Sequence, residues 1–504
     1  MMINPTSPNA AGVYQIKKNE GAKAAASTQA AAETQASPSD SAQVQFSKGG
    51  VNVASLLATT AEAAAQIESA LPEHVPGQVI VKLKPDFAFS TQDTNGVLGG
   101  FAQDYGAEVA HRFDIPQNMF KSFNGEMMVV QLPAGMTTAQ GIAAMGEDPR
   151  VEFAASNDVV QLDPAELTAD SDAEVSATPE KLNSKLWGLN NEGQTGGTVD
   201  ADIDAPEAWN IQTGKNQAEN GPLIAVVDTG INYNHEALQG NLWTNPGEIP
   251  GNGIDDDGNG VIDDVHGYNA AAKTGDPLDD NDHGSHCAGT IGANGDNSKG
   301  LFGVMHKANI MGVKFLTASG GGTLQAAIDS VLYASKMGAR IQSHSWGGGG
   351  FNKALYEAFK ASPSMHVVAA GNERNNNDAR PAYPATFDLP NVISVAATDH
   401  KDNLASFSNY GATTVDVAAP GVDILSSTSG KADAYNTFSG TSMATPHVTG
   451  VAGLIVSEYP EITNDELKAR IMETVDAKPQ LSGKMVTGGR VNAHEALKPK
   501  DGEA

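Results

Sequence analysis

The chain has 504 residues, with 60 Asp and Glu against 31 Lys and Arg, and a formal net charge of −29 at pH 7. This length suits two or three domains, and 40% apolar residues suit a sizeable core rather than disorder throughout. The acidic excess disfavours nucleic acid as a partner, because phosphates would be repelled.

Residues 1–74 are rich in Ala, Ser, Thr and Gln and nearly free of aromatic residues, so we expect a disordered tail. Within it, residues 53–71 combine good helix formers with Leu, Ile and Val at helical spacing, which favours one amphipathic helix. The N-terminus shows no apolar h-region of a Sec signal peptide, and no run of about 18 apolar residues predicts a membrane span.

Residues 75–162 alternate apolar strand-like segments with helical ones, which predicts a small α+β module of the βαββαβ type. The strand-like segments include 78–84, 126–133 and 151–162, and the helical ones are 97–106 and 137–149. Residues 163–185 are polar and acidic without a periodic core face, so we expect an exposed linker that is open to proteolysis.

Residues 186–497 alternate short apolar strands with helices, and residues 498–504 form a polar tail. Several strands are apolar on both faces, which is typical of a parallel sheet covered by helices on both sides. The candidate strands are 223–228, 309–316, 340–346, 366–372, 392–399 and 415–420, and the candidate helices include 323–338, 353–362 and 464–475.

Three reactive residues stand at strand ends or helix starts, where open parallel sheets carry their functional groups. Asp228 ends an apolar strand, His283 opens a small-residue segment, and Ser442 precedes a long apolar helix. Singly, each has a structural explanation, and His283, His286 and the only cysteine, Cys287, could also be ligands of a metallohydrolase. Together, a carboxylate, an imidazole and a hydroxyl are the groups needed to make a serine nucleophilic: the imidazole accepts the hydroxyl proton, and the carboxylate orients the imidazole.

Residues 186 to about 497 resemble the subtilisin-like serine proteases, or subtilases. The resemblance is carried by AVVDTGI, DDNDHGSHCAGTIG, SWGGG, AAGN, PAYPA and GTSMATPHVTG, all in sequence. It implies a subtilisin-like sheet with Asp228 as the acid that orients the imidazole, His283 as general base and Ser442 as nucleophile. It also implies that the Asn372 amide donates to the oxyanion, and that His286 and Cys287 are packing residues.

Subtilases bind an extended peptide as an added strand, a mode of recognition that reads the backbone first. By resemblance, two Gly-rich segments line the subsites on either side of that strand. They contain Gly320, Gly321 and Gly322 in the first and Ser345, Trp346 and Gly347 in the second. Glycines on the wall of the main pocket favour an open apolar pocket.

The interval between Asp228 and His283 holds an acidic, Gly-rich insertion. Within it, oxygen-bearing side chains alternate up to Gly260, as in the first positions of a calcium-binding loop. His266 stands at position 12 in place of Glu, which excludes a complete EF-hand. The predicted Ca²⁺ ligands are Asp255, Asp257, Asn259, Val261, Asp263 and Asp264.

The module at 75–162 resembles the inhibitory propeptide of subtilases, a ferredoxin-like domain whose C-terminal tail lies in the active site until it is cut. We therefore expect a secreted, monomeric endopeptidase made as an autoprocessed zymogen, with polypeptide substrates and its own propeptide as inhibitor. Export would need a route other than Sec, for which residues 1–74 are a candidate signal. The alternative is a non-catalytic peptide-binding module on the same fold.

Overall fold

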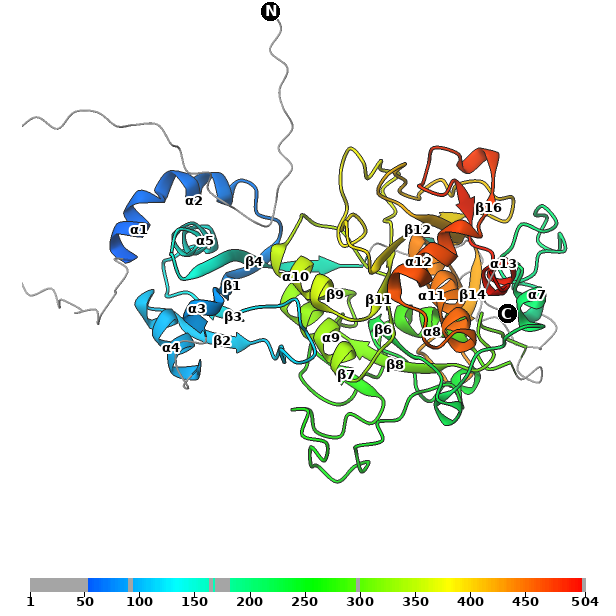
Figure 1. Ribbon diagram of the computed structural model, residues 1–504, viewed down its shortest axis with the longest axis horizontal. Helices are drawn as coiled ribbons and strands as arrows, with labels where there is room; N and C mark the ends of the chain where they lie inside the picture. The colour runs from blue at the N-terminus through cyan, green and yellow to red at the C-terminus, as the bar shows by residue number, and fades with distance from the viewer. Residues whose placement is uncertain (1–52, 89–93, 163–165, 168–181, 296–299, 501–504) are drawn as a thin grey trace, which may run out of the picture.

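The computed structural model describes residues 53–88, 94–162, 166–167, 182–295 and 300–500. Figure 1 shows a small N-terminal domain, blue to cyan, beside a larger domain, green to red. The remainder of the predicted tail and most of the predicted linker lie outside the described residues. In the described ranges, no helix has the length and apolar character needed to cross a bilayer.

The small domain is an antiparallel sheet in the order β2-β3-β1-β4, with helices on one face, as predicted. Helix α5 begins at a capping box between Thr137 and Gln140 and buries nearly its whole length. The elements are β1 (His74–Leu83), α3 (Pro85–Ala88), α4 (Thr94–Asp104), β2 (Glu108–Arg112), β3 (Glu126–Gln131), α5 (Thr138–Gly146) and β4 (Val151–Gln161).

The predicted tail is wrong over residues 53–68, which form α1 (Val53–Thr59) and α2 (Ala61–Glu68). The single expected helix is divided at Thr60, whose hydroxyl donates to Leu56 O at 2.7 Å. Ala64 and Ile67 are buried in the core of the small domain, where α2 packs against α5. An Ala-rich segment therefore belongs to this domain, because a partner helix covers its narrow apolar face.

The large domain is built on a nine-stranded sheet in the order β16-β17-β13-β12-β11-β10-β6-β8-β7. Its strand pairs are parallel except β16 with β17. The strands are β6 (Leu223–Asp228), β7 (Gly267–Asn269), β8 (Asn309–Lys314), β10 (Ile341–His344), β11 (Met365–Ala369), β12 (Val392–Thr398), β13 (Val417–Pro420), β16 (Asp476–Ala477) and β17 (Gly489–Arg490).

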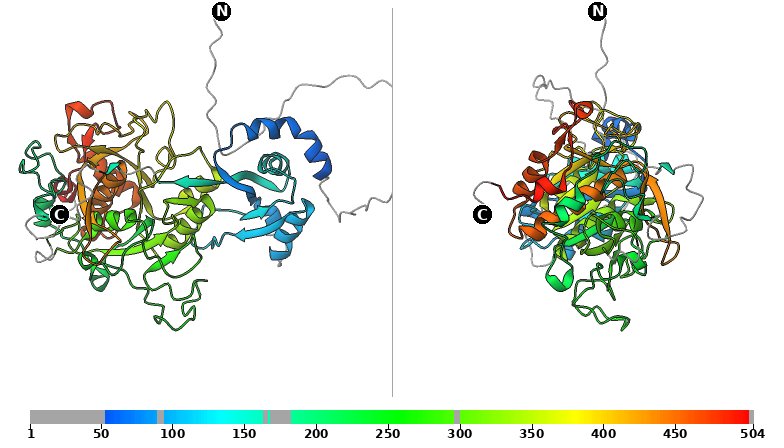
Figure 2. Two further views of the ribbon diagram at one scale, coloured as in Figure 1. Left: turned by 180° about the vertical axis from the view of Figure 1, so that it is seen from behind. Right: turned by 90° about the vertical axis from the view of Figure 1, so that its right-hand side faces the viewer.

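Helices cover both faces of this sheet, as the two-faced apolar strands predict (Figures 1 and 2). Alternate residues of β6 enter different cores: Ile224 and Val226 lie in one, Ala225 and Val227 in the other. The first core holds α8 and α11, and the second holds α9 and α10. The helices are α7 (Ala205–Trp209), α8 (His283–Gly292), α9 (Leu324–Lys336), α10 (Lys353–Ala361), α11 (Thr441–Glu458), α12 (Asn464–Glu473) and α13 (Ala493–Leu497), with short 3-10 turns at Gln217–Glu219, Glu236–Leu238 and Pro479–Leu481.

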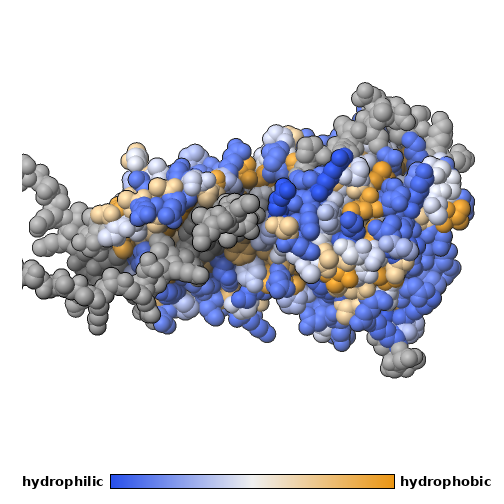
Figure 3. Space-filling view, turned by 90° about the horizontal axis from the view of Figure 1, so that it is seen from above, coloured by the Kyte–Doolittle hydropathy of each residue, from blue (hydrophilic) through white to orange (hydrophobic). Residues whose placement is uncertain are grey.

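The two domains share a sheet, because β9 (Gly321–Thr323) of the large domain pairs with β4 of the small one. A separate three-stranded sheet joins β14 (Ile424–Ser427), β15 (Tyr435–Ser439) and β5 (Glu166–Leu167). On the face seen in Figure 3, apolar surface residues form separate small groups among hydrophilic residues.

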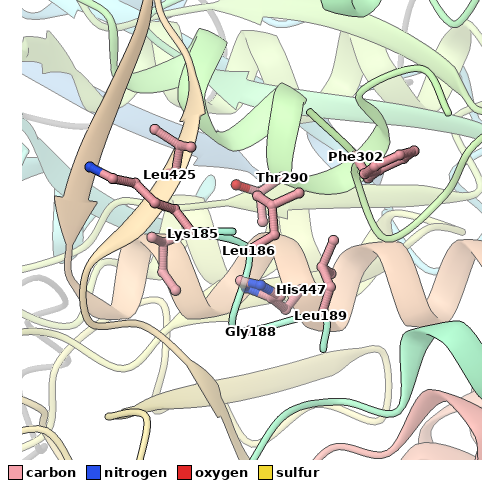
Figure 4. Close-up of a pocket in the computed structure, with 9 residues that line it drawn as sticks. Lys185, Leu186, Gly188, Leu189, Thr290, Phe302, Leu425 and His447 are labelled. Atoms are coloured by element: carbon pink, nitrogen blue, oxygen red, sulfur yellow. The ribbon is translucent and has the colours of Figure 1, made fainter. Parts of the chain in front are cut away.

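The large domain begins before the predicted residue 186. Leu182 is fully buried in the core that holds α8 and α11. Figure 4 shows residues 185–189 passing beside α11, with Leu186 and His447 lining one cavity of about 10 Å³, roughly the space of one water molecule. The large domain therefore begins by Leu182, four residues before the predicted boundary.

Candidate active site

Asp228 and His283 form a buried hydrogen-bonded pair. Asp228 ends β6 and His283 opens α8, and His283 Nδ1 lies 2.8 Å from Asp228 Oδ1. Both residues are at most 3% exposed. A buried carboxylate at this nitrogen fixes the imidazole tautomer and stabilises the imidazolium, which is the role that the sequence predicts for Asp228.

Two residues that the sequence reasoning missed hold this pair in place. The buried Asp279 carboxylate accepts from the Thr229 hydroxyl at 2.9 Å and from the Ser285 hydroxyl at 2.6 Å. The same Thr229 hydroxyl accepts from Gly284 N at 2.9 Å. The end of β6 is thereby bonded to the first turn of α8. The only sequence signal was an acid four residues before His283.

Ser442 lies in the first turn of α11, beside α8. Its carbonyl accepts from the thiol of Cys287, one helical turn after His283, at 3.6 Å. Its hydroxyl donates to Ser345 O at 3.0 Å, and the Ser345 hydroxyl donates back to Ser442 O at 2.9 Å. The Ser442 proton must therefore be redirected before an imidazole can accept it, as is common in enzymes without bound substrate.

Asn372 follows β11 and is held by the residue that precedes Ser442. Its Oδ1 accepts from Thr441 N at 2.9 Å and from the Thr441 hydroxyl at 3.0 Å. A methyl group placed on Gly440 would lie 3.5 Å from Ser442 N and 3.6 Å from Asn372 Nδ2. Both N–H donors thus border one small space. Ser442, as the second residue of α11, has no helical acceptor for its own N–H.

The first Gly-rich segment is occupied by the small domain. Residues Val159–Gln161 of β4 pair antiparallel with β9, and Leu162 N donates to Gly320 O at 2.9 Å. A Cβ on Gly322 would lie 2.6 Å from Phe315 O, so this segment leaves little room for side chains. Gly320, Gly321 and Gly322 therefore pair with a strand of the small domain, and their binding of a substrate peptide stays a prediction.

In the second Gly-rich segment, which contains Ser345 and Gly347, Trp346 is buried. Its side chain is 2% exposed and packs against Phe315, with the ring centroids 4.8 Å apart. Only the backbone of this residue can face a bound peptide. Ser345 lies against Ser442, and Gly347 lies close to the next loop, where an added Cβ would be 3.4 Å from Tyr383 O.

Two parts of the chain match known protein families. The model of the subtilase family matches residues 219–492, which is more than half of the chain. The chain belongs to the subtilase family. Residues 60–157 match the fervidolysin N-terminal prodomain, so the small domain of this subtilase is a propeptide domain.

The relatives are proteases. Thermitase of Thermoactinomyces vulgaris is 39% identical over 298 residues, which are 58% of this chain and 93% of thermitase. The thermophilic serine proteinase of Bacillus sp. (strain AK1) is 36% identical over 293 residues, 58% of this chain and 64% of that protein. The subtilase is accordingly a subtilisin-like serine endopeptidase.

The fold of the two domains together has a solved counterpart. Fervidolysin from Fervidobacterium pennivorans, described as a keratinolytic enzyme related to subtilisin, matches with a TM-score of 0.60 at 22% identity. The match covers 85% of this chain and 62% of the fervidolysin chain. At 22% sequence identity, this structural similarity shows a shared fold.

The metal-binding alternative at His283, His286 and Cys287 does not fit the structure. His286 Nε2 lies 2.9 Å from Ile424 O and its ring stacks on Phe438, and burial lowers its pKa to about 3. Burial raises the pKa of the Cys287 thiol, which disfavours the thiolate that a metal needs. The side chain that lies near His283 and Cys287 is Asp228, with the ligand atoms of all three within 4.8 Å of one another.

The acidic insertion brings two of its predicted ligands together with one that the sequence reasoning missed. Carboxylate oxygens of Glu248, Asp257 and Asp264 lie within 4.8 Å of one another. Glu248 and Asp264 are buried, and burial raises the pKa of the Asp264 carboxyl. Three carboxylates that share one space suit a hard divalent cation such as Ca²⁺, which would offset their repulsion.

The other predicted ligands have different partners. Asp255 accepts from Asn259 N and Gly260 N, and Asp263 accepts from the backbone of Gly251 and Gly253. The Asn259 amide nitrogen donates to Asp257 and Asp264. The structure therefore gathers Asp257, Asn259 and Asp264. Asp255 and Asp263 accept backbone hydrogen bonds within the loop, and the Val261 side chain packs against the core, so Ca²⁺ ligation by these three residues stays a prediction.

Proposed function

We propose that this subtilase hydrolyses peptide bonds through Asp228, His283 and Ser442 by way of an acyl-enzyme. The observation that carries the proposal is the buried 2.8 Å contact between His283 Nδ1 and Asp228, on a helix that packs beside Ser442. The contact leaves His283 Nε2 as the nitrogen that takes up the serine proton, because Nδ1 is held by the carboxylate.

In the proposed mechanism, Ser442 Oγ attacks the scissile carbonyl carbon and its proton passes to His283 Nε2. The tetrahedral oxyanion accepts hydrogen bonds from Ser442 N and Asn372 Nδ2. The imidazolium then protonates the leaving amine, and the C–N bond breaks to give the acyl-enzyme. Water, deprotonated by His283, attacks the acyl carbonyl and releases the acid, which restores the Ser442 hydroxyl.

We propose that the autoprocessing site lies in residues 163–185, between the propeptide domain and the catalytic domain. The propeptide domain consists of residues 75–162 and the preceding helices α1 and α2. Leu162 is hydrogen-bonded to Gly320, and Glu166 pairs with Ser439, three residues before Ser442. Because Leu182 is buried in the catalytic core, a cut before that residue would leave the core intact.

We also propose that the enzyme acts outside the cell.

We propose Ca²⁺ as a structural ion of the acidic insertion. Glu248, Asp257 and Asp264 would hold it, and it would supply the positive charge that lets these carboxylates lie together. No catalytic step depends on it.

A Ser442→Ala variant tests the catalytic proposal. Expressed as the full chain, it is expected to keep its propeptide and to lose peptide hydrolysis by about 10⁵- to 10⁶-fold, whereas the wild type shortens itself. Incubating the pure variant with a trace of active enzyme should restore the cut. A pure Ser442→Ala protein that processes itself would contradict the proposal.

A further inference from the structure

A cavity of about 620 Å³ opens next to the proposed oxyanion site. One wall is formed by Glu373 and Arg374, which follow Asn372, and another by Gly348 and Gly349, which follow Ser345–Gly347. Arg380 lies on the same cavity. The cavity therefore adjoins, along the chain, both segments that contact Ser442 and Thr441.

The cations of this cavity lack counterions. Within the described residues, the side chains of Arg374 and Arg380 have no ion pair or hydrogen bond, and both are exposed. A third cation, Lys484, lies 4.5 Å from the centroid of Tyr410, another residue of the cavity wall. In a chain of net charge −29, the described residues thus place two cations on this wall, and a third beside Tyr410, for which the structure gives no acidic partner.

The nearby acids have other partners. Glu373 accepts from the Asn409 amide at 2.5 Å. Asp378 accepts from the hydroxyls of Thr413 at 2.9 Å and Thr414 at 2.7 Å. Neither carboxylate is bonded to Arg374 or Arg380, so the guanidinium groups keep their donors for an incoming anion.

The chain's own processing linker matches this charge. Residues 163–185 contain six acidic residues and only two lysines. The acids are Asp163, Glu166, Asp170, Asp172, Glu174 and Glu180. An enzyme that cuts itself in this segment meets an acidic side chain at many of the available positions.

We propose that the cavity binds an acidic side chain on the N-terminal side of the scissile bond, so that the enzyme prefers to cut after Glu or Asp. Arg374 and Arg380 are the specificity-determining residues, because a guanidinium can bind a carboxylate with two parallel hydrogen bonds. This assignment replaces the open apolar pocket that the sequence predicts, and it rests on the proposed function of Ser442.

Paired peptide substrates test the assignment on the self-processed enzyme. Two tetrapeptides with one chromogenic leaving group differ only in Glu or Gln before that group, so shape is kept and charge is changed. We expect the wild type to show a kcat/KM about 5- to 10-fold higher for Glu than for Gln. The Arg374→Ala/Arg380→Ala variant should bring this ratio to about one while kcat/KM for the Gln peptide stays within roughly 2-fold.

Lys307→Ala is the matched control, because Lys307 is an exposed cation already paired with Glu219; it should leave the ratio unchanged. A wild type that cleaves the Gln peptide as well as or better than the Glu peptide would overturn the specificity assignment and leave the catalytic proposal standing. Failure to cleave either peptide, or casein, would instead count against the proposed function.

Discussion

Asn372 Oδ1 accepts two hydrogen bonds from Thr441, the residue immediately before Ser442. The amide is thereby oriented from its oxygen end, which leaves Nδ2 as the end that borders the space next to Ser442 N. The loop after β11 and the start of α11 are thus joined at the point where negative charge develops during acyl transfer.

Mutations can separate the two functions of the Asn372 amide, which are donation from Nδ2 to the oxyanion and anchoring of Oδ1 to Thr441. Asn372→Ala removes both, whereas Asn372→Asp keeps the oxygen that accepts both hydrogen bonds from Thr441 and loses the donor. We expect both variants to lower kcat about 10²- to 10³-fold with KM little changed, measured with a chromogenic peptide. Thr441→Val removes the hydroxyl anchor, together with the hydrogen bond that this hydroxyl accepts from Gly371 N at 3.1 Å, and should have a smaller effect on kcat because Asn372 Nδ2 is kept. An Asn372→Asp enzyme with wild-type kcat would refute the donor role.

A prodomain residue caps a helix of the catalytic domain. Asn157 Oδ1 accepts from Gln325 N at 2.8 Å in the first turn of α9. We expect Asn157→Ala to weaken inhibition by the propeptide about 5-fold, since a lost cap costs about 1 kcal/mol. Activity after complete propeptide removal should be unchanged, because Asn157 is then absent. Progress curves of self-activation measure both quantities, and an unaltered inhibition phase would contradict the role.

The buried histidines predict loss of stability in acid. His344 Nε2 lies 2.9 Å from His366 Nδ1, and both rings are fully buried. Burial lowers the pKa of His366 to about 3 and, with the neighbouring His366, holds the pKa of His344 well below its ordinary value. Below about pH 6.5 the unfolded chain therefore binds protons that the folded protein does not, and stability falls as the pH falls.

The expected cost is about 1.4 kcal/mol per histidine for each pH unit below 6.5, until the folded pKa is reached. In a Ser442→Ala background, which prevents self-digestion, replacing both residues by Leu should flatten the fall of Tm between pH 6.5 and 4.5. His494→Gln, a partly exposed histidine on α13, serves as control. Parallel Tm profiles for the Leu variant and its parent would speak against this source of acid sensitivity.

Calcium removal tests the acidic insertion. At 100 times its Kd, a bound ion adds about 2.7 kcal/mol, which for a domain of roughly 320 residues corresponds to a Tm rise of about 4 °C. Glu248→Gln and Asp264→Asn should abolish that rise, whereas Asp256→Asn should retain it, because Asp256 accepts from Ile249 N and is not one of the three grouped carboxylates. Calorimetry without a calcium signal, and a Tm insensitive to EDTA, would exclude the ion.

Buried parallel strands were the most predictable part of the fold. The apolar run at 223–228 has the same bounds as β6, because both of its faces enter a core. The positions of Asp228, His283 and Ser442 at an element's end or start follow from the same pattern. Short motifs at such places gave the candidate site, and the structure adds the 2.8 Å contact and the Asp279 scaffold.

The features that were missed depend on long-range contacts without a local signal. β9 is Gly-Gly-Thr, which has no apolar alternation, and it is a strand because β4 pairs with it. Glu248 lies in a Pro-Gly turn outside the calcium-loop pattern and reaches Asp264 only through the folded insertion. Trp346 was expected at the subsites from the family resemblance of its segment, and its side chain is buried against Phe315.

Labelling with a fluorophosphonate tests the central claim most directly. The purified protein is incubated with the probe, with and without prior removal of calcium, and the labelled peptide is mapped by mass spectrometry. The account predicts a single adduct on Ser442, on a chain shortened within residues 163–181, and its loss in His283→Ala. A folded wild-type protein that takes up no label in either condition would contradict it and favour a non-catalytic peptide-binding module.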